Sequence, residues 1–584
     1  MNYPYIPGLP RRMGVALSAL FARDGIAKHI AKLEVLHGAE SGPLPLDAGD
    51  DAIYQAGDAA SRHCYAVADR IKTVDAILDE IRQECARREV PEPEGEKPSE
   101  KIARAVDRGW WIRSIRKAHA RRFEHAAIQL GFTSYRTGPY LSNESAARQA
   151  RRNKQNEKLL ASIEVQNELG QSYTLAHLAS LGMSNKTIRR GELMTRIRGF
   201  EEIATDLKHV GVFGTLTAPS KYHGVLSASG EANPKYIAFG SPTPRQAQKH
   251  LVGVWARARA ALHRRGIHAY GFRIAEPHHD GCPHWHMLMF VAPEHVETYE
   301  QIIKSYALAE DGDEAGAQKN RVKFVRINPE KGSAAGYIAK YVSKNIDGEA
   351  VGDHRTIEGH IVVADLIGDM EITPSQRVTY WSQTWGIRQF QQIGGAPVGV
   401  WRELRRIKAE TVQGGSEALK KAWQAVQKIE GSPEVAKQAS WAAYLKAQGG
   451  PVVGRMGAIR LACREADIEG KYATYTAAKP VGVYEAACVN REGEPTRIYE
   501  SVRYVWTRKQ VEAFAVAVPW TGVNNCTQVD YGDISAKMEK STDAVIEAVK
   551  NKKFSAPAWV DWPEIRRQAK EIDQATWKFA SKKN

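Results

Sequence analysis

Apolar positions in the first part of the chain recur mainly at helical spacing. In residues 13–36 and 59–85 the apolar side chains lie three and four positions apart, the period of an amphipathic helix. A basic helical segment is predicted from 101 to about 130, and a long polar helix from 143 to 170. Proline and glutamate dominate residues 91–100, which indicates a solvated linker. The pattern therefore predicts a mainly helical N-terminal region.

Residues 173–200 are predicted to form two short helices joined at Gly182. A helix-turn-helix that reads DNA is one interpretation of this pair. An ordinary helical corner is the other, and it is the more frequent arrangement. The pattern alone favours the corner.

From about residue 205 the pattern changes to short apolar segments typical of strands. Strands are predicted at 210–217, 267–275, 284–291 and 322–327. Helices are predicted at 243–264 and 333–344. This order implies a mainly antiparallel sheet with helices packed against it, an α+β fold. The aromatic residues in 376–406 are expected to pack in the core.

These changes of pattern divide the chain into four regions. We predict a helical N-terminal region at 1–100, a basic helical region at 101–204, an α+β domain at 205–410 and a mixed C-terminal α/β region at 411–584. In the last region, helices are predicted at 416–430, 433–447, 534–552 and 562–580, around a β-leaning stretch at 472–518. The sequence assigns no chemistry to this region.

The charge of the chain favours a polyanionic partner. Its 584 residues contain 82 Lys and Arg against 67 Asp and Glu, a formal net charge of +15. Residues 101–160 are especially basic and also contain Trp110, Trp111, Phe123 and Tyr135, so we expect them to hold single-stranded or melted DNA. The six cysteines form no CxxC pair, as expected of free thiols in a reducing cytoplasm. We find neither a signal peptide nor an apolar run long enough to cross a membrane.

Residues 276–290 hold the first chemical signal. His284 and His286 flank Trp285, so on a strand both imidazoles lie on one face and can hold a divalent metal. Glu276 ends the preceding strand, and the turn at 277–283 is expected to return it beside His284. A carboxylate ligand favours Mg²⁺ or Mn²⁺.

Two other interpretations of this stretch stay open. One is a structural zinc site, whose soft ligands would lie at a compressed spacing: His278 or His279, Cys282, His284 and His286. The other is a pair of unrelated histidines on a polar face.

The second signal lies in residues 336–345. Tyr337 and Tyr341 are one helical turn apart, so their hydroxyls lie on one face. Lys340 and Lys344 lie on the same helix, and Lys344, three residues after Tyr341, can reach that face. A nearby cation or metal favours the phenolate, which can attack a phosphate and form a phosphotyrosine. On its own, the helix would more often be amphipathic with half-buried tyrosines. Thr215 and Thr217 could support the metal or contact a phosphate.

Together these segments carry a resemblance. Phe213-Gly-Thr-Leu-Thr217, Glu276-Pro-His-His-Asp-Gly-Cys-Pro-His-Trp-His286 and Tyr337-Ile-Ala-Lys-Tyr-Val-Ser-Lys344 resemble the three ordered motifs of HUH endonucleases. The paired tyrosines resemble the bacteriophage replication gene A protein family, as do residues 189–201 and 385–391. The similarity spans roughly 100–410.

The resemblance implies a function for the domain at 205–410. It would be an HUH endonuclease with a five-stranded antiparallel palm, a metal on Glu276, His284 and His286, and the catalytic residues Tyr337, Tyr341 and Lys344. It would nick single-stranded or melted DNA at a phage origin in the cytoplasm of the bacterial host, through a 5′-phosphotyrosyl link. The free 3′-hydroxyl would prime rolling-circle synthesis by the host DNA polymerase. The sequence has no Gly-x-x-x-x-Gly-Lys-Ser/Thr loop, so a host helicase would unwind the duplex.

Two alternatives belong to other classes. One is a non-catalytic DNA-binding regulator with a structural zinc site. The other is a relaxase or transposase of the same HUH chemistry.

Overall fold

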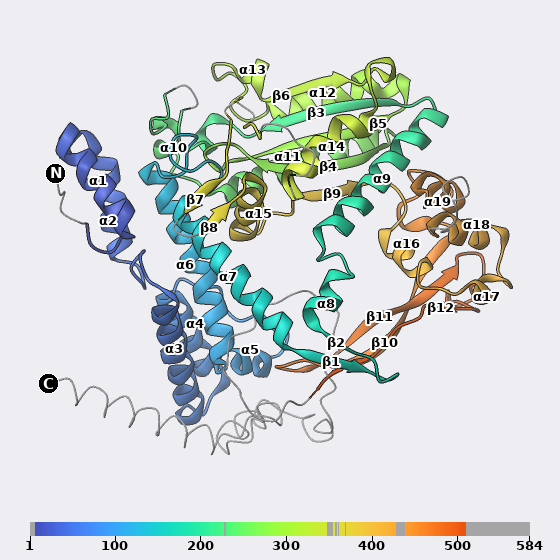
Figure 1. Ribbon diagram of the computed structural model, residues 1–584, viewed down its shortest axis with the longest axis horizontal. Coiled ribbons are helices and arrows are strands. Elements are labelled where there is room, and N and C mark those ends of the chain that lie inside the picture. Colours follow the sequence, from blue (N-terminus) through green and yellow to red (C-terminus); the bar gives the residue numbers. More distant parts are fainter. Residues whose placement is uncertain are drawn as a thin grey trace. The chain divides into compact units, whose positions relative to one another are not determined.

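The computed structural model describes residues 6–226, 229–346, 348, 354–356, 359, 361–367, 370–427 and 439–509. The fold is α+β, as predicted, with a mainly helical N-terminal region (Figure 1). The helices up to the sheet are α1 (Arg11–Asp24), α2 (Ile30–Glu40), α3 (Asp50–Arg70), α4 (Val74–Arg87), α5 (Pro98–Ala105), α6 (Arg108–Leu130), α7 (Asn143–Ser162), α8 (Leu175–Ser180) and α9 (Lys186–Asp206). The later helices are α10 (Pro234–Ala238), α11 (Pro244–Arg264), α12 (Val296–Ala307), α13 (Ala317–Asn320), α14 (Ala334–Ile346), α15 (Pro374–Trp385), α16 (Val398–Leu404), α17 (Ala409–Val412), α18 (Glu417–Val426) and α19 (Trp441–Gln448).

The chain forms two compact units. The smaller contains Ala48–Ala118 and Asp467–Thr476, and the larger contains the described parts of Met1–Asp47, His119–Ala466 and Ala477–Thr527. The segment with His284 and His286 and the helix with Tyr337 and Tyr341 both lie in the larger unit. The predicted boundaries at 100, 204 and 410 stay predictions. No helix in the described part of the chain is long and apolar enough to cross a membrane.

The central sheet has five antiparallel strands in the order β6-β3-β5-β4-β9. These strands are β3 (Val210–Thr217), β4 (Ala269–Pro277), β5 (Pro283–Val291), β6 (Val322–Arg326) and β9 (Phe390–Ile393). The structure therefore confirms the expected five-stranded antiparallel sheet. All nine residues of β5 are buried, which explains its nearly continuous apolar sequence.

The remaining strands form smaller pairings. They are β1 (Glu164–Asn167), β2 (Ser172–Thr174), β7 (Asp365–Ile367), β8 (Met370–Ile372), β10 (Ile459–Glu469), β11 (Thr474–Glu485), β12 (Tyr499–Glu500) and β13 (Trp506–Arg508).

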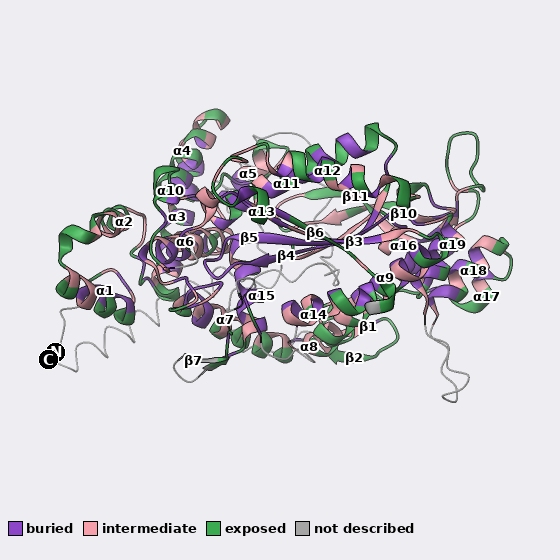
Figure 2. Ribbon diagram, turned by 90° about the horizontal axis from the view of Figure 1, so that it is seen from above, coloured by how far each residue is buried: buried purple, intermediate pink, exposed green. Residues whose placement is uncertain are grey.

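Helices cover both faces of the central sheet, and alternate residues of β5 face opposite layers. Leu288 and Phe290 belong to the core formed with α9, α14 and α19, whereas Met287 and Met289 belong to the core formed with α11, α12 and α15. Figure 2 shows the buried strands β3, β4 and β5 with α11 and α12 on one side and α9 and α14 on the other. Because the period is two, His284 and His286 share the face of Leu288.

Two features fix α14 on this face. The carboxylate of Glu201 in α9 accepts hydrogen bonds from the backbone N–H groups of Ala334 and Ala335, two donors in the first turn of α14 that have no partner within the helix. The apolar side chains of Ile338 and Val342 are fully buried in the core beneath. The opposite stripe of α14 is left with the tyrosines and lysines.

Several predicted elements have different bounds in the structure. The helix predicted at 143–170 is wrong beyond Ser162, because Glu164–Asn167 forms β1 and pairs with β2 and with the distant β13. The helical pattern at 13–36 is interrupted at Gly25, where φ is 80°. The helices predicted at 534–552 and 562–580 lie outside the described residues.

The packing of α9 on α19 yields a stability prediction. A Cβ atom on Gly199 would lie 2.7 Å from the backbone nitrogen of Ala442, whereas one on Gly191 of the same helix would meet nothing within 4 Å. We expect Gly199→Ala to lower the free energy of unfolding by about 1–3 kcal/mol through overpacking. Gly191→Ala should leave it unchanged or raise it by up to about 1 kcal/mol. Urea unfolding followed by tryptophan fluorescence measures both, and equal stability of the two variants would contradict the close approach.

Candidate metal centre and tyrosine helix

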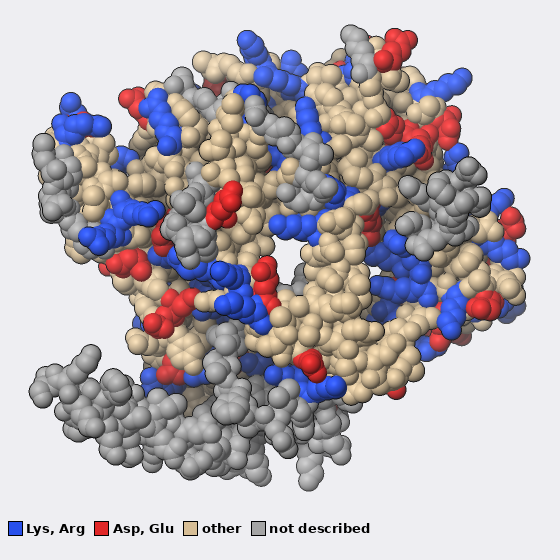
Figure 3. Space-filling view, in the orientation of Figure 1, with Lys and Arg blue, Asp and Glu red and all other residues tan. Residues whose placement is uncertain are grey.

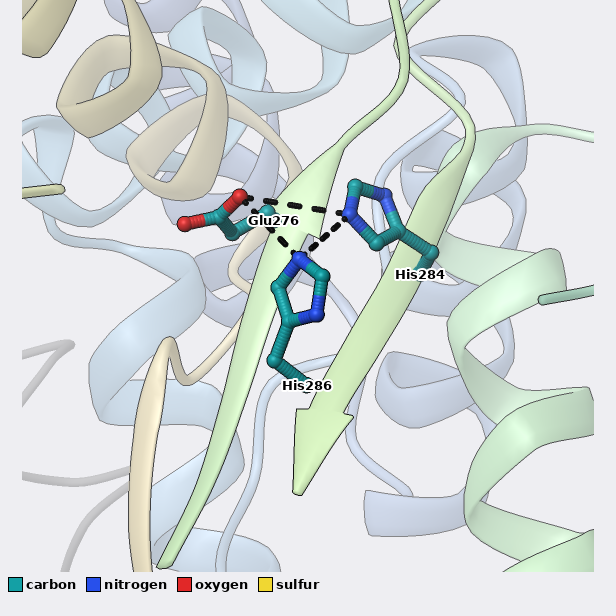
Figure 4. Close-up of side chains that lie close together, drawn as sticks. All are labelled: Glu276, His284 and His286. Atoms are coloured by element: carbon teal, nitrogen blue, oxygen red, sulfur yellow. Dashed lines mark hydrogen bonds and ion pairs between the residues drawn. The ribbon is translucent and has the colours of Figure 1, made fainter. Parts of the chain in front are cut away.

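The antiparallel register of β4 and β5 brings three metal-ligand side chains together. Glu276 is directly opposite His284, and His286 lies two residues further on the same face. The Nε2 atoms of the two histidines are 3.1 Å apart, and Oε2 of Glu276 is 3.9 Å from His284 Nε2 and 3.5 Å from His286 Nε2. Figure 4 shows the carboxylate and both imidazoles converging on one point. The structure thus brings together the three residues that the sequence predicted as ligands.

The three side chains fit a divalent metal. Each is at least 96% buried, and the three ligand atoms lie within 4.8 Å of one another. Burial lowers the pKa of His284 well below its usual value, so this imidazole is neutral and able to coordinate. Burial alone would raise the pKa of Glu276, but Lys344, His286 and Asn345 together lower it to about 2. Two imidazole nitrogens and one carboxylate form a donor set that a divalent cation can use.

Residues around the ligands hold them in position. Thr215 on β3 lies opposite His286, with Oγ1 3.2 Å from Nδ1, so a hydrogen bond there leaves Nε2 directed at the centre. Asn345 on α14 donates through Nδ2 to Oε1 of Glu276 and accepts through Oδ1 from Nε2 of Gln389, at 3.4 Å. Thr215 was a sequence candidate, but Asn345 and Gln389 were missed. Asn345 follows directly after the Lys344 of the third motif, and this adjacency was the only available signal.

The tyrosine helix packs against the same centre. The ring of Tyr341 is 4.2 Å from the ring of His286, and its side chain is half-buried. Tyr337, one turn earlier, is 37% exposed. Both rings contact Phe213 of β3, at 4.7 Å for Tyr337 and 5.4 Å for Tyr341. Burial raises the pKa of Tyr341 above its usual value in this structure.

The two lysines of α14 make different contacts. Lys344 lies with Nζ 3.5 Å from Oε2 of Glu276 and donates to the carbonyl of Arg355 at 2.8 Å. Lys340 places Nζ 4.6 Å from the ring centre of Tyr337 and 4.9 Å from that of Tyr341. The cation beside the tyrosines is therefore Lys340, and the cation beside the metal ligands is Lys344.

The interpretation as a structural zinc site requires Cys282 as a ligand, but Cys282 is not part of the group whose atoms converge. Among the residues that the structure describes, the one group with metal-ligand geometry is Glu276, His284 and His286. The Sγ atom of Cys282 lies 3.9 Å from the carbonyl oxygen of Pro283, and Asp280 pairs with His223 at 3.1 Å. This part of the chain forms the turn between β4 and β5.

In the basic segment 101–160, two of the four aromatic side chains that were expected to stack on DNA bases are buried. Trp111 and Phe123 are fully buried in helical cores, so neither ring is available to a base. Trp110 and Tyr135 are half-buried.

Comparisons with known proteins place the chain among phage replication proteins. A sequence model of the bacteriophage replication gene A protein family matches residues 52–349, about half of the chain, including the metal ligands and both tyrosines. The replication gene A protein of Escherichia phage 186 is 42% identical over 358 residues, covering 61% of this chain and 48% of that protein. That of Escherichia phage P2 is 34% identical over 445 residues, covering 74% and 56%.

A third relative carries a more specific name. A probable replication endonuclease from a prophage-like region of Salmonella paratyphi A is 29% identical over 479 residues, covering 80% of this chain and 57% of that protein. The chain spans about half the length of the curated relatives that it matches. No solved structure matches it.

The metal site can be tested by direct binding. Loss of a residue that only positions a metal ligand weakens metal binding roughly 10–100-fold. We expect His284→Ala to weaken Mn²⁺ binding by more than this, because it removes one of the three converging ligands. His263→Ala, which removes an exposed histidine from α11, should leave the affinity unchanged. Isothermal titration calorimetry measures both. Equal affinity of the two variants would exclude His284 as a ligand.

Asn345 provides a second test. Asn345→Ala removes the amide that fixes Glu276, so we expect Mn²⁺ binding to weaken roughly 10–100-fold. The exposed Asn320→Ala on α13 is the control, and it should bind like the wild type. Circular dichroism should be the same for both variants. Wild-type metal affinity in Asn345→Ala would show that the carboxylate is positioned without this contact.

Proposed function

Because this chain belongs to the bacteriophage replication gene A protein family, we propose that it is a metal-dependent endonuclease and strand transferase. It acts on single-stranded or melted DNA at a phage origin and starts rolling-circle replication. The observation that carries the proposal is the packing of Tyr341, on α14, against His286 of the buried metal-ligand group. A nucleophile and an electrophilic centre are thereby held on one face of one sheet.

The relatives support this proposal. A relative named as a probable replication endonuclease aligns with 80% of this chain. The family match includes the predicted metal ligands and both tyrosines, the residues to which the proposal assigns the chemistry. A regulator with a structural zinc site would need a closed set of ligands, whereas three ligands leave room for a phosphate oxygen.

The reaction is a transesterification. The phenolic oxygen of one tyrosine attacks the phosphorus, the bond from phosphorus to the 3′-oxygen breaks, and the phenolic proton ends on that oxygen. The products are a 5′-phosphotyrosine and a free 3′-hydroxyl. One phosphodiester is exchanged for another, so the strand can be rejoined without an energy source. The second tyrosine repeats the attack on the regenerated origin, and the new 3′-hydroxyl displaces the first tyrosine to close a circle.

Each side chain has a role in this proposal. Glu276, His284 and His286 hold Mg²⁺ or Mn²⁺, which when bound would polarise the scissile phosphate. Tyr337 and Tyr341 are the nucleophiles. Lys344, with Lys340, offsets charge that develops in the transition state. Lys340 lies over both rings, so its ammonium group is close enough to offset negative charge that develops during the attack by either tyrosine.

The partners belong to the proposal as well. The free 3′-hydroxyl primes the host DNA polymerase, and a host helicase separates the duplex. The reaction takes place in the cytoplasm of the bacterial host.

A covalent-adduct assay tests the function. Single-stranded DNA covering this protein's own gene is incubated with protein and Mn²⁺, with EDTA as the control, and is run on a denaturing gel. We expect an adduct whose digestion maps to Tyr337 or Tyr341. Each single Tyr→Phe variant should lose its own adduct and still bind DNA, because a hydroxyl is removed and the packed ring remains. The double variant should form none.

Tyr475→Phe, at an exposed tyrosine of β11, is the matched control and should form the wild-type amount of adduct. Loss of DNA binding in both single variants, with unchanged circular dichroism, would contradict the catalytic assignment. So would an absent wild-type adduct together with bound DNA and stoichiometric zinc, provided that a related active initiator forms its adduct alongside.

A further inference from the structure

A second site lies on the same face of the sheet, between the start of α9 and the edge strand β9. The cavity there has a volume of about 460 Å³. One wall is formed by Met183, Arg189 and Arg196, and the other by residues 387–392. On the face drawn in Figure 3, Lys and Arg side chains border a hollow beside α8 and the start of α9. The metal ligands are not among its lining residues.

The cavity has more positive than negative charge. Arg189, Arg196 and Arg388 line it. Arg196 is 8% exposed and pairs with Glu192 at 3.4 Å, but Glu192 also accepts both hydrogen bonds of Arg402, at 2.7 and 3.0 Å. One carboxylate therefore serves two guanidinium groups.

Two of these arginines have capacity left for an anion. The Nε atom of Arg196 is buried and has no hydrogen-bond partner among the described residues. Burial lowers the pKa of Arg196 to about 10, and the nearby Arg402 and Arg388 lower it too. Arg388 donates from Nε to the carbonyl of Phe390, and no carboxylate of the described chain lies within ion-pair distance of it. An incoming anion would relieve this excess of positive charge.

The rest of the lining suits a base. Phe390 is a half-buried aromatic at the cavity wall, where one part of its ring packs against the core. Stacking on an aromatic ring is one way in which proteins hold unpaired bases. A base inside a duplex is paired and stacked, so it cannot enter such a cavity.

The cavity is also connected to the metal centre. Gln389, in its wall, donates to Asn345, and Asn345 donates to Glu276. Two hydrogen bonds thus separate the cavity lining from a metal ligand. A nucleotide bound there would lie close to a phosphate at the centre.

We propose that this cavity binds one unpaired nucleotide of the DNA strand that is cut, with Arg196 and Arg388 on its phosphate and Phe390 against its base. The position relative to the cut rests on the proposed function, whereas the binding of a nucleotide does not. Phe390 and Arg388 then help to select and position the strand.

Binding in EDTA tests the cavity without cleavage. A fluorescent oligothymidylate is titrated at several salt concentrations with wild type, Arg388→Gln and Arg198→Gln. Arg198 is on α9 outside the cavity, paired with Glu202 and 74% exposed. We expect Arg388→Gln to reduce the slope of log affinity against log salt by about 0.7, the value for one phosphate contact on a single strand. Arg198→Gln should keep the wild-type slope, and equal slopes in the two variants would overturn the proposal.

The base contact has its own readout. Phe390→Leu keeps an apolar side chain but removes the ring, so binding should weaken about 5- to 100-fold with an unchanged salt slope. An oligomer containing 5-iodouracil should cross-link in the wild type to a peptide that includes residue 390. Cross-links elsewhere, with wild-type affinity in Phe390→Leu, would overturn the base assignment.

Two further arms separate the possible outcomes. Free thymidine monophosphate should compete only at far higher concentration than the oligomer, and competition at equal concentration would assign the cavity to a free nucleotide instead of a strand. The Mn²⁺ adduct assay runs in parallel. A wild-type adduct with normal binding by the cavity variants contradicts the cavity alone, whereas cavity-dependent binding without any adduct contradicts the proposed function alone.

Discussion

The buried carboxylate of Glu276 constrains the whole centre. An isolated charge at 1% exposure is costly, so it needs compensation from every side. His286 provides it from the neighbouring strand, and Lys344 and Asn345 provide it from α14. The sheet register and the docking of the tyrosine helix are therefore coupled, since each supplies partners to the same oxygen atoms. A divalent metal on this group would take over part of the compensation that Lys344 gives in its absence.

The register of β4 and β5 is the step on which this geometry depends. A slip of one residue would turn His284 and His286 towards the opposite core and bring Trp285 to the site. The apolar alternation of β5 opposes such a slip, because Met287 and Met289 fill one core while Leu288 fills the other. The same alternation that builds the core thereby also places the two histidines of the candidate metal site.

The sequence alone predicted those features of the fold and the site that depend on a short local repeat of the chain. Strand β3 has the predicted bounds, and the placement of His284 and His286 on one face follows from the period of two. Asn345 could not be found in this way, because its partner Glu276 is 69 residues away and a polar residue on a helix carries no spacing signal. Strand β1 was hidden for the same reason: Val165 pairs with Arg508, far along the chain, while its local composition favours a helix.

Helix α9 links the two sites of this face. Its first turns supply Arg189 and Arg196 to the cavity, and its later part supplies Glu201, which caps α14. Between them, Gly199 brings the helix against α19 so closely that its position has little freedom. One rigid element thus sets both the cavity wall and the start of the tyrosine helix. A strand that bound in the cavity would therefore meet the two tyrosines of α14 at a distance fixed by the fold, the arrangement that pre-organised catalysis requires.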